Sequence, residues 1–204
     1  MTEGFSLLWY KNLCALWRCL QGVFHPPVIA GLENIPEEGP AIICANHISS
    51  RDPLMLASWE RRPIAFMGKS ELFAVKPLAW LLRKLGCFPV ARGEADLSSV
   101  RTALNVLKSG DLLGIFPQGH RRTKRMTGEP PMQTGVAMIA LRSSSPVIPI
   151  RIEGSWKLFT RIYVTVGEPL TFPDVKRVDK QTIEEVTSII ENKIFSMTAI
   201  PKQV

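Results

Sequence analysis

The sequence is poor in cysteine and histidine, and what it lacks narrows the classes of protein to which it can belong. Its 204 residues contain four cysteines and three histidines, and no two cysteines stand in a C-x-x-C spacing. This pattern argues against a disulfide-stapled secreted domain and against a zinc site, so we expect reduced thiols, no metal and no cofactor. Internal repeats and low-complexity tracts are absent too. The length predicts a single domain.

The first residues also lack the features of an export signal. No basic region precedes the first apolar residues, the first charged residue is Glu3, and no small-residue cleavage site follows. We therefore expect a protein that stays on the cytoplasmic side of the membrane. The net charge of +7 predicts attraction to something anionic, such as a phosphorylated substrate, lipid headgroups, an acidic protein or nucleic acid.

Residues 5–24 approach, but do not reach, the apolar character of a membrane span. The segment is crowded with leucine and tryptophan, and its charges are Lys11 and Arg18. Tryptophan beside lysine and arginine suits an amphipathic helix in the headgroup region, with an ordinary core helix or a true span as alternatives. We expect such an interfacial helix over residues 1–25 and a second region over residues 26–204. Two prolines separate them, which makes His25 a linker residue.

From residue 26 onward, apolar stretches typical of strands alternate with amphipathic stretches typical of helices. Strands are predicted at 28–32, 41–44, 64–67, 88–91, 112–116, 147–152 and 161–166, and helices from residue 53 and at 77–85, 96–108, 135–142 and 179–197. A strand–helix–strand order favours parallel pairing through crossovers. The expected fold is therefore α/β, a single domain with a mixed, mostly parallel central sheet flanked by helices.

One histidine and one aspartate are close enough in the sequence to suggest a catalytic pair. His47 and Asp52 follow the strand that ends at Cys44. A neutral imidazole accepts a proton at neutral pH, and a carboxylate on its other ring nitrogen would fix the tautomer and stabilise the imidazolium. On one continuous helix these two side chains would point about 140° apart, so the pair needs a loop that folds Asp52 back. The alternative is that Asp52 only serves as a helix N-cap and His47 ends a loop.

Arginines follow two further strand ends. Arg92 follows the predicted strand 88–91, and Arg121 and Arg122 follow the strand 112–116 after Gly119. Loops at the carboxyl ends of parallel strands share one edge of a sheet, where α/β proteins bind ligands. A guanidinium fork binds phosphate, and glycine lets backbone approach closely. These residues predict a site for a phosphate-bearing alcohol whose hydroxyl is deprotonated, with solvated surface arginines as the alternative.

These blocks together resemble the glycerolipid acyltransferase family, whose best-known members are the 1-acylglycerol-3-phosphate acyltransferases. Four ordered blocks of that family have counterparts between about residues 28 and 166: Asn46, His47 and Asp52; Gly86 to Arg92; Phe116 to Arg121; and Val147 to Ile150. The resemblance implies a glycerol-3-phosphate acyltransferase-like fold and makes residues 26–204 an acyltransferase domain. Gln118 departs from the family's usual Glu, and His120 departs from its usual Thr or Ser, so the preferred acceptor could differ from lysophosphatidic acid.

The activity that the resemblance implies is direct acyl transfer in phospholipid biosynthesis. His47, oriented by Asp52, would deprotonate the free hydroxyl of 1-acylglycerol-3-phosphate (lysophosphatidic acid), which attacks acyl-CoA or an acyl carrier protein thioester and gives phosphatidic acid. The arginines would hold phosphate, and a lysine would stabilise the oxyanion unless it is a solvated surface lysine. The residues expected to bind substrate are Arg92, Gly119, Arg121, Arg122, Gln118 and Lys69.

Other interpretations compete with this one. An acyl-enzyme mechanism would use Ser49 or Ser50, but the Gly-x-Ser-x-Gly turn is absent. A non-enzymatic basic module would bind a membrane surface through residues 121–125 and the N-terminal helix, and an acyltransferase could also take another lysolipid acceptor. Nucleic acid is not expected as a partner, because no stacking aromatics are interleaved with these cations.

Overall fold

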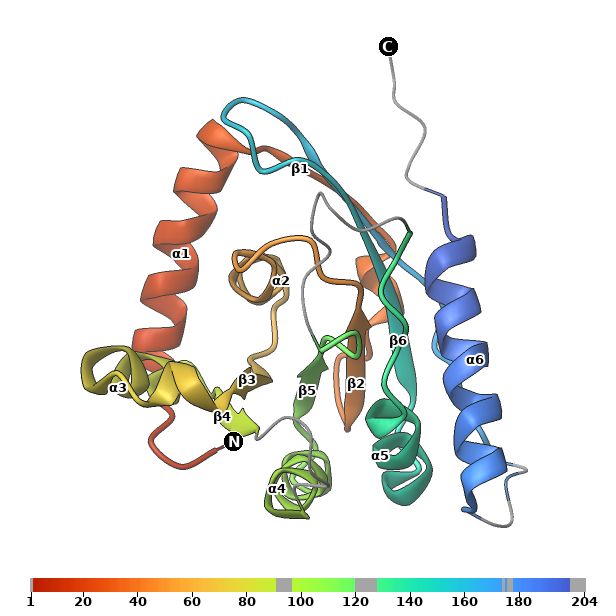
Figure 1. The fold of residues 1–204 in the computed structure, drawn as a ribbon. Coiled ribbons are helices and arrows are strands. Elements are labelled where there is room, and N and C mark those ends of the chain that lie inside the picture. The colour runs from red at the N-terminus through yellow and green to blue at the C-terminus, as the bar shows by residue number, and fades with distance from the viewer. Residues whose placement is uncertain (1, 91–96, 120–127, 174, 176–177, 199–204) are drawn as a thin grey trace.

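The computed structural model describes residues 2–90, 97–119, 128–173, 175 and 178–198 (Figure 1). In these ranges the α-helices are α1 (Leu7–Phe24), α2 (Asp52–Trp59), α3 (Lys76–Lys84), α4 (Leu97–Lys108), α5 (Gly135–Ser143) and α6 (Lys180–Ser196). The strands are β1 (Pro27–Ala30), β2 (Ala41–Ala45), β3 (Ile64–Lys69), β4 (Phe88–Val90), β5 (Leu112–Ile115), β6 (Val147–Gly154) and β7 (Ile162–Val166). Two 3-10 turns, η1 (Leu32–Asn34) and η2 (Ser70–Phe73), join them. Each predicted strand and helix has its counterpart here, with ends shifted by a few residues.

The strands form one mixed sheet in the order β1-β7-β6-β2-β5-β3-β4. From β6 to β4 all neighbouring strands are parallel, whereas β7 runs antiparallel to β6 and pairs in parallel with β1. The central strand β2 is Ala-Ile-Ile-Cys-Ala and is buried along its whole length. A continuous apolar run is what a parallel strand needs when both of its faces are covered. The predicted α/β fold with a mostly parallel sheet is confirmed.

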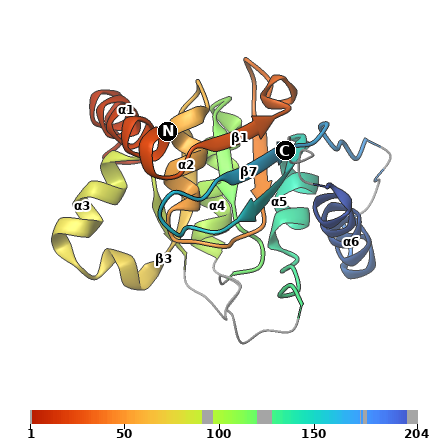
Figure 2. The ribbon, with the colours of Figure 1, turned by 90° about the horizontal axis from the view of Figure 1, so that it is seen from above.

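Helices cover both faces of this sheet (Figures 1 and 2). One face packs against α1 and α2, and the other packs against α4, α5 and α6. Successive side chains of a strand alternate between the two faces, so Ile43 lies in the first cluster while Ile42 and Cys44 lie in the second. The carboxyl ends of β2, β5, β3 and β4 therefore share one edge, where the connecting loops meet.

The N-terminal helix α1 is fixed to the domain by its few polar groups. The buried Tyr10 hydroxyl accepts a hydrogen bond from the backbone N–H of Ile64 at 3.0 Å, and its burial raises the pKa of that phenol. Arg18 donates from Nε to the carbonyl of Ser58 at 2.8 Å. One of the two cations of this helix thus contacts α2, and the exposed side chains of the helix include Leu8, Leu16 and Leu20. No helix in the described ranges is long and apolar enough to cross a bilayer.

The prediction that His25 is only a linker residue was wrong. Its side chain is 7% exposed, and its ring lies 5.2 Å from the ring of Trp156, centroid to centroid, in an edge-to-face arrangement. Sequence reasoning placed it in a linker because two prolines follow it. The prolines do end the helix, but the chain turns inward at that point and buries the imidazole between α1 and the segment after β6.

Candidate active site

His47 and Asp52 meet at the carboxyl end of β2. The Nδ1 atom of His47 lies 2.8 Å from Oδ2 of Asp52, whose side chain is fully buried, while the imidazole is 16% exposed. The N-cap position of α2 is Arg51, whose side chain makes no capping hydrogen bond, and Asp52 is the first helical residue. The alternative in which Asp52 only serves as the N-cap is therefore wrong, because its carboxylate turns back toward the loop that precedes the helix.

The Asp52 carboxylate accepts hydrogen bonds from four directions. Its Oδ2 atom accepts from the imidazole and from the backbone N–H groups of Ile48 at 2.8 Å and Ser49 at 2.7 Å. Its Oδ1 atom accepts from the indole N–H of Trp156 at 3.0 Å. An ionised carboxylate can only accept hydrogen bonds, so each of its four partners must donate. The hydrogen-bond network thus assigns the proton of neutral His47 to Nδ1 and leaves the lone pair on Nε2.

Aromatic packing fixes the plane of the imidazole. The ring of His47 stacks on Phe116 with centroids 4.3 Å apart and an angle of 30° between the planes. Phe116 in turn stacks on Phe66 of β3 at 6.0 Å. Offset stacking of this kind restricts the rotation of a ring, so the imidazole is held both by its hydrogen bond and by the stacking contact. A side chain held in this way loses less conformational freedom when it binds a ligand.

Asn46 attaches the histidine loop to the neighbouring strand β6. Its side-chain amide donates to the carbonyl of Ile152 at 2.9 Å and accepts from the N–H of the same residue at 2.6 Å. The side chain is 1% exposed. The side chain of an asparagine carries a donor and an acceptor at its end. It can therefore form the two hydrogen bonds that the backbone of a neighbouring strand would otherwise form. This pairing explains why an asparagine directly precedes His47.

Gln118 holds the same loop from the side of β5. Its Oε1 atom accepts from the backbone N–H of His47 at 2.9 Å, and its Nε2 atom donates to the carbonyl of Pro130 at 3.1 Å and lies 3.4 Å from Oε2 of Glu129. The side chain is 1% exposed. A glutamate could not donate to Pro130 unless it were protonated. Both ends of Gln118 are thus engaged by the protein, and its predicted contact with substrate stays a prediction.

Gly119 adopts a backbone conformation that few other residues tolerate. Its φ angle is +69°, and a Cβ atom at this position would lie 2.6 Å from Nε2 of Gln133. Glycine is favoured there by the left-handed conformation, whereas the flexible end of the Gln133 side chain could move aside. The turn after β5 therefore depends on this residue, and its contact with a ligand remains a prediction.

The remaining predicted substrate residues are only partly placed by the structure. Lys69 ends β3 at the shared sheet edge, and its Nζ atom lies 2.7 Å from Oε1 of Glu71. The hydrogen bond from Lys69 holds the pKa of Glu71 below its ordinary value. Arg92, His120, Arg121 and Arg122 lie outside the described residues. They follow the carboxyl ends of β4 and β5 in the sequence, and their roles stay predictions.

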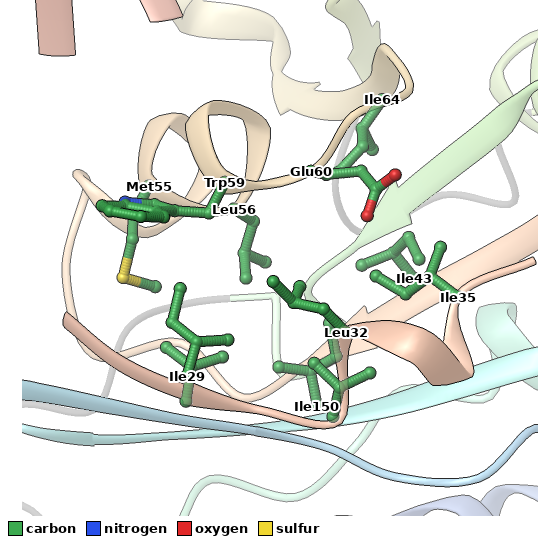
Figure 3. Close-up of a pocket in the computed structure, with 12 residues that line it drawn as sticks. Ile29, Leu32, Ile35, Ile43, Met55, Leu56, Trp59, Glu60, Ile64 and Ile150 are labelled. Carbon is green, nitrogen blue, oxygen red and sulfur yellow. The ribbon is translucent and has the colours of Figure 1, made fainter. Parts of the chain in front are cut away.

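An apolar cavity lies under α2, the helix that begins with Asp52 (Figure 3). Its walls come from β1, η1, α2 and the sheet, and include Ile29, Leu32, Met55, Leu56 and Trp59. Glu60 is the one acidic residue among its lining residues, and its carboxylate accepts from the N–H of Arg62 at 3.0 Å. The same helix that begins with Asp52 therefore forms one wall of this apolar space.

Comparison with known proteins assigns the chain to a family. Residues 27–153 match the protein family described as Acyltransferase, which covers more than half of the chain. The chain therefore belongs to the acyltransferase family, and the predicted class of enzyme is confirmed. The matched residues include His47 and Asp52 as well as the loop that follows β5.

Individual relatives agree with this assignment. The chain is 29% identical over 169 residues to the 1-acyl-sn-glycerol-3-phosphate acyltransferase of Bacillus subtilis. This match covers 79% of this chain and 83% of that protein. It is 28% identical over 169 residues to the enzyme of the same name from Streptococcus pneumoniae, and there the match covers 79% of this chain but 62% of the relative.

A solved structure shares the fold. The crystal structure of the 1-acyl-sn-glycerophosphate acyltransferase PlsC from Thermotoga maritima aligns with a TM-score of 0.67 at 23% identity. The alignment covers 94% of this chain and 81% of that one. At this level of identity the likeness supports the arrangement of helices and strands described above.

Proposed function

We propose that this chain transfers an acyl group from an acyl thioester to the free hydroxyl of 1-acyl-sn-glycerol-3-phosphate and so forms phosphatidic acid. The observation that carries the proposal is the oriented base, since the imidazole of His47 lies 2.8 Å from the buried carboxylate of Asp52 within the family-matched residues. The names of the relatives in Bacillus and Streptococcus support the acceptor. The donor is acyl-CoA or an acyl carrier protein thioester.

The proposed mechanism is a direct transfer. The Nε2 atom of His47 takes the proton of the acceptor hydroxyl, whose oxygen attacks the thioester carbonyl carbon. The tetrahedral intermediate then breaks its carbon–sulfur bond, and the imidazolium returns its proton to the departing thiolate. Asp52 stabilises the imidazolium between these two steps. Proton and electron pair are both accounted for, and no acyl-enzyme forms.

The predicted cations complete this proposal. Arg92, Arg121 and Arg122 would bind the acceptor's phosphate, since guanidinium groups form paired hydrogen bonds with phosphate oxygens. Lys69 would stabilise the oxyanion of the intermediate, provided that it exchanges its partner Glu71 for the substrate. These four roles are the part of the mechanism that rests on the sequence blocks and on the shared sheet edge.

We place the enzyme on the cytoplasmic face of a membrane, with α1 lying in the headgroup region. The outer face of this helix exposes Leu8 to 69%, Leu16 to 57% and Val23 to 65%. Exposed leucine and valine on one helix, with tryptophan and basic residues nearby, favour the boundary between headgroups and acyl chains. The proposed acceptor and product are lipids, so such a position would bring the base to its substrate.

The decisive experiment follows thiol release from acyl-CoA and acyl carrier protein with a panel of lysolipids. We expect release only with an acceptor, strongest with 1-acyl-sn-glycerol-3-phosphate, and we expect His47→Ala to lose turnover by about three orders of magnitude. The same variant should still bind vesicles. A burst of thiol without acceptor would indicate an acyl-enzyme instead. Unchanged turnover in His47→Ala would exclude the proposed base.

A further inference from the structure

The loop between β6 and β7 displays two large apolar side chains at its tip. Leu158 is 68% exposed and Phe159 is 73% exposed. Phe159 also has a φ angle of +60°. A bulky residue rarely adopts this left-handed conformation, because its Cβ atom approaches the backbone, and such strain persists where the surrounding structure imposes it. A strained and solvent-exposed aromatic tip calls for a functional explanation.

The loop lies beside the C-terminal end of α1 and is hydrogen-bonded to it (Figure 1). The N–H of Phe159 donates to the carbonyl of Phe24 at 2.8 Å, and the two rings lie 5.9 Å apart. Within the loop, the hydroxyl of Thr160 donates to the carbonyl of Lys157 at 2.6 Å and also contacts the carbonyl of Ser155. The tip is therefore a fixed extension of the helix surface and not an independent arm.

A second aromatic contact ties the other end of α1 to α3. Trp9 and Trp80 meet edge to face at 5.2 Å, and both rings are about half exposed. Between these two contacts, α1 presents its own exposed apolar side chains. Exposed apolar side chains thus occur on α3, along α1 and on the β6–β7 loop, and aromatic contacts join these three elements. Exposed apolar groups gathered in this way indicate a contact surface.

Cations flank the tip of the loop. Lys157 immediately precedes the apolar pair and Arg161 follows it closely, and both are exposed. Apolar tips between basic side chains suit an anionic bilayer, because the apolar groups enter the acyl region while the cations remain at the phosphates. A second copy of the chain fits this surface less well, since it would bring the same cations against each other and the chain carries a net charge of +7.

We propose that residues 155–161 form a second membrane-inserting element, with Leu158 and Phe159 entering an anionic phospholipid bilayer beside the C-terminal end of α1. The proposal extends the membrane attachment given under the proposed function, and it rests on that function only in taking α1 to lie on the same surface. Attachment to the membrane would then involve two segments that are far apart in the sequence, α1 and residues 155–161.

The test measures binding of the full chain to vesicles of equimolar phosphatidylcholine and phosphatidylglycerol by co-sedimentation. We expect Phe159→Ala to weaken binding about tenfold, because most of a phenylalanine's apolar surface would no longer be buried. The matched control is Ile189→Ala on α6, which removes a half-exposed apolar side chain from the opposite face of the sheet and should leave binding unchanged. The double variant Lys157→Gln with Arg161→Gln should weaken binding to these vesicles but not to pure phosphatidylcholine.

Unchanged vesicle binding of Phe159→Ala would overturn the proposal, as would concentration-dependent dimerisation that this substitution abolishes. Turnover with substrate dispersed in detergent separates this result from the proposed function. Wild-type binding of Phe159→Ala together with normal turnover would reject the loop and leave the acyltransferase proposal standing. Weakened binding in a chain that acylates none of the lysolipids would support the loop and reject that function.

Discussion

Trp156 donates its indole N–H to Oδ1 of Asp52 across 3.0 Å. The two residues are about one hundred positions apart in the sequence. On its other sides the indole contacts His25 at 5.2 Å and Trp17 at 6.3 Å, measured between ring centroids. One side chain therefore joins α1 to the carboxylate that orients His47. We regard Trp156 as a positioning residue of the site, because its contact with the base passes through Asp52.

The first prediction removes this donor. We expect Trp156→Phe to lower kcat about tenfold, because one hydrogen bond to a buried charged group is lost while most of the ring packing is kept. KM for the acceptor should change little. Steady-state kinetics of both substrates would measure the effect. Trp59→Phe is the matched control, since its indole N–H donates to Gln21 at 3.2 Å, and a comparable drop in its kcat would argue against a specific role for Trp156.

The second prediction tests the carboxylate itself. Asp52→Asn keeps the shape of the side chain but cannot accept hydrogen bonds at both end atoms, so His47 would lose its assigned tautomer. We expect kcat to fall by about three to four orders of magnitude. Thermal unfolding measured in parallel should show a folded but less stable protein, because an amide N–H group now faces backbone donors. Near-normal turnover in this variant would show that Asp52 does not orient the base.

The third prediction concerns the departure from the family block. We expect Gln118→Glu to destabilise the fold by about 1–3 kcal/mol near neutral pH, because the buried carboxylate cannot donate to Pro130 and lies near Glu129. The pKa of the introduced carboxyl would be raised by burial and by this neighbouring charge. An acid with a raised pKa in the folded state destabilises at high pH, so the deficit should shrink as the pH falls toward about 4.3.

Chemical unfolding at several pH values would measure this deficit. Gln181→Glu on α6 is the control, since it makes the same substitution at an exposed position where Gln181 donates to Glu185. The control should change stability by a few tenths of a kcal/mol. A Gln118→Glu protein as stable as the wild type at every pH would contradict the assigned hydrogen bonds of Gln118.

The fourth prediction concerns the thiols. Cys19 is exposed, whereas Cys44 and Cys14 are buried, and burial raises the pKa of the Cys87 thiol to about 12. A thiol with a raised pKa stays protonated and reacts slowly. We expect a maleimide at neutral pH to modify Cys19 quickly in the folded protein and the other three only after unfolding. Mass spectrometry of intact protein and of peptides would identify the modified residues, and rapid labelling of Cys87 would contradict the raised pKa of its thiol.

The fold was predictable from the sequence because its signals are local. Strand β2 is an uninterrupted apolar run, and α4 repeats its apolar residues at helical spacing, so each is recognisable without its neighbours. The His47–Asp52 contact was predictable as a possibility, because a loop between a strand and a helix start can bring two nearby residues together. Its alternative, a simple N-cap, used the same residues and could be separated only by the direction of the carboxylate.

The partners of the dyad that come from far along the chain were not predictable. Trp156 lies in a loop with no motif spacing to Asp52, and no periodicity singles it out. The same holds for Ile152, whose backbone groups hold Asn46, because one strand backbone looks like any other in sequence. His25 was misjudged for a related reason. Burial of a single polar residue depends on tertiary contacts that a local pattern does not record.

The reversed direction of β7 bears on the proposed contact with a membrane. A parallel successor to β6 would have required a crossover that returns the chain to the far edge of the sheet before the next strand begins. The exposed apolar tip and the imidazole of His47 lie at the same end of the sheet because β6 and β2 are parallel, and the antiparallel β7 lets the chain turn back there within one short loop. The proposed reaction site and the proposed membrane contact would then face a bilayer together, and a substrate lipid would move only a short distance out of the bilayer to reach His47.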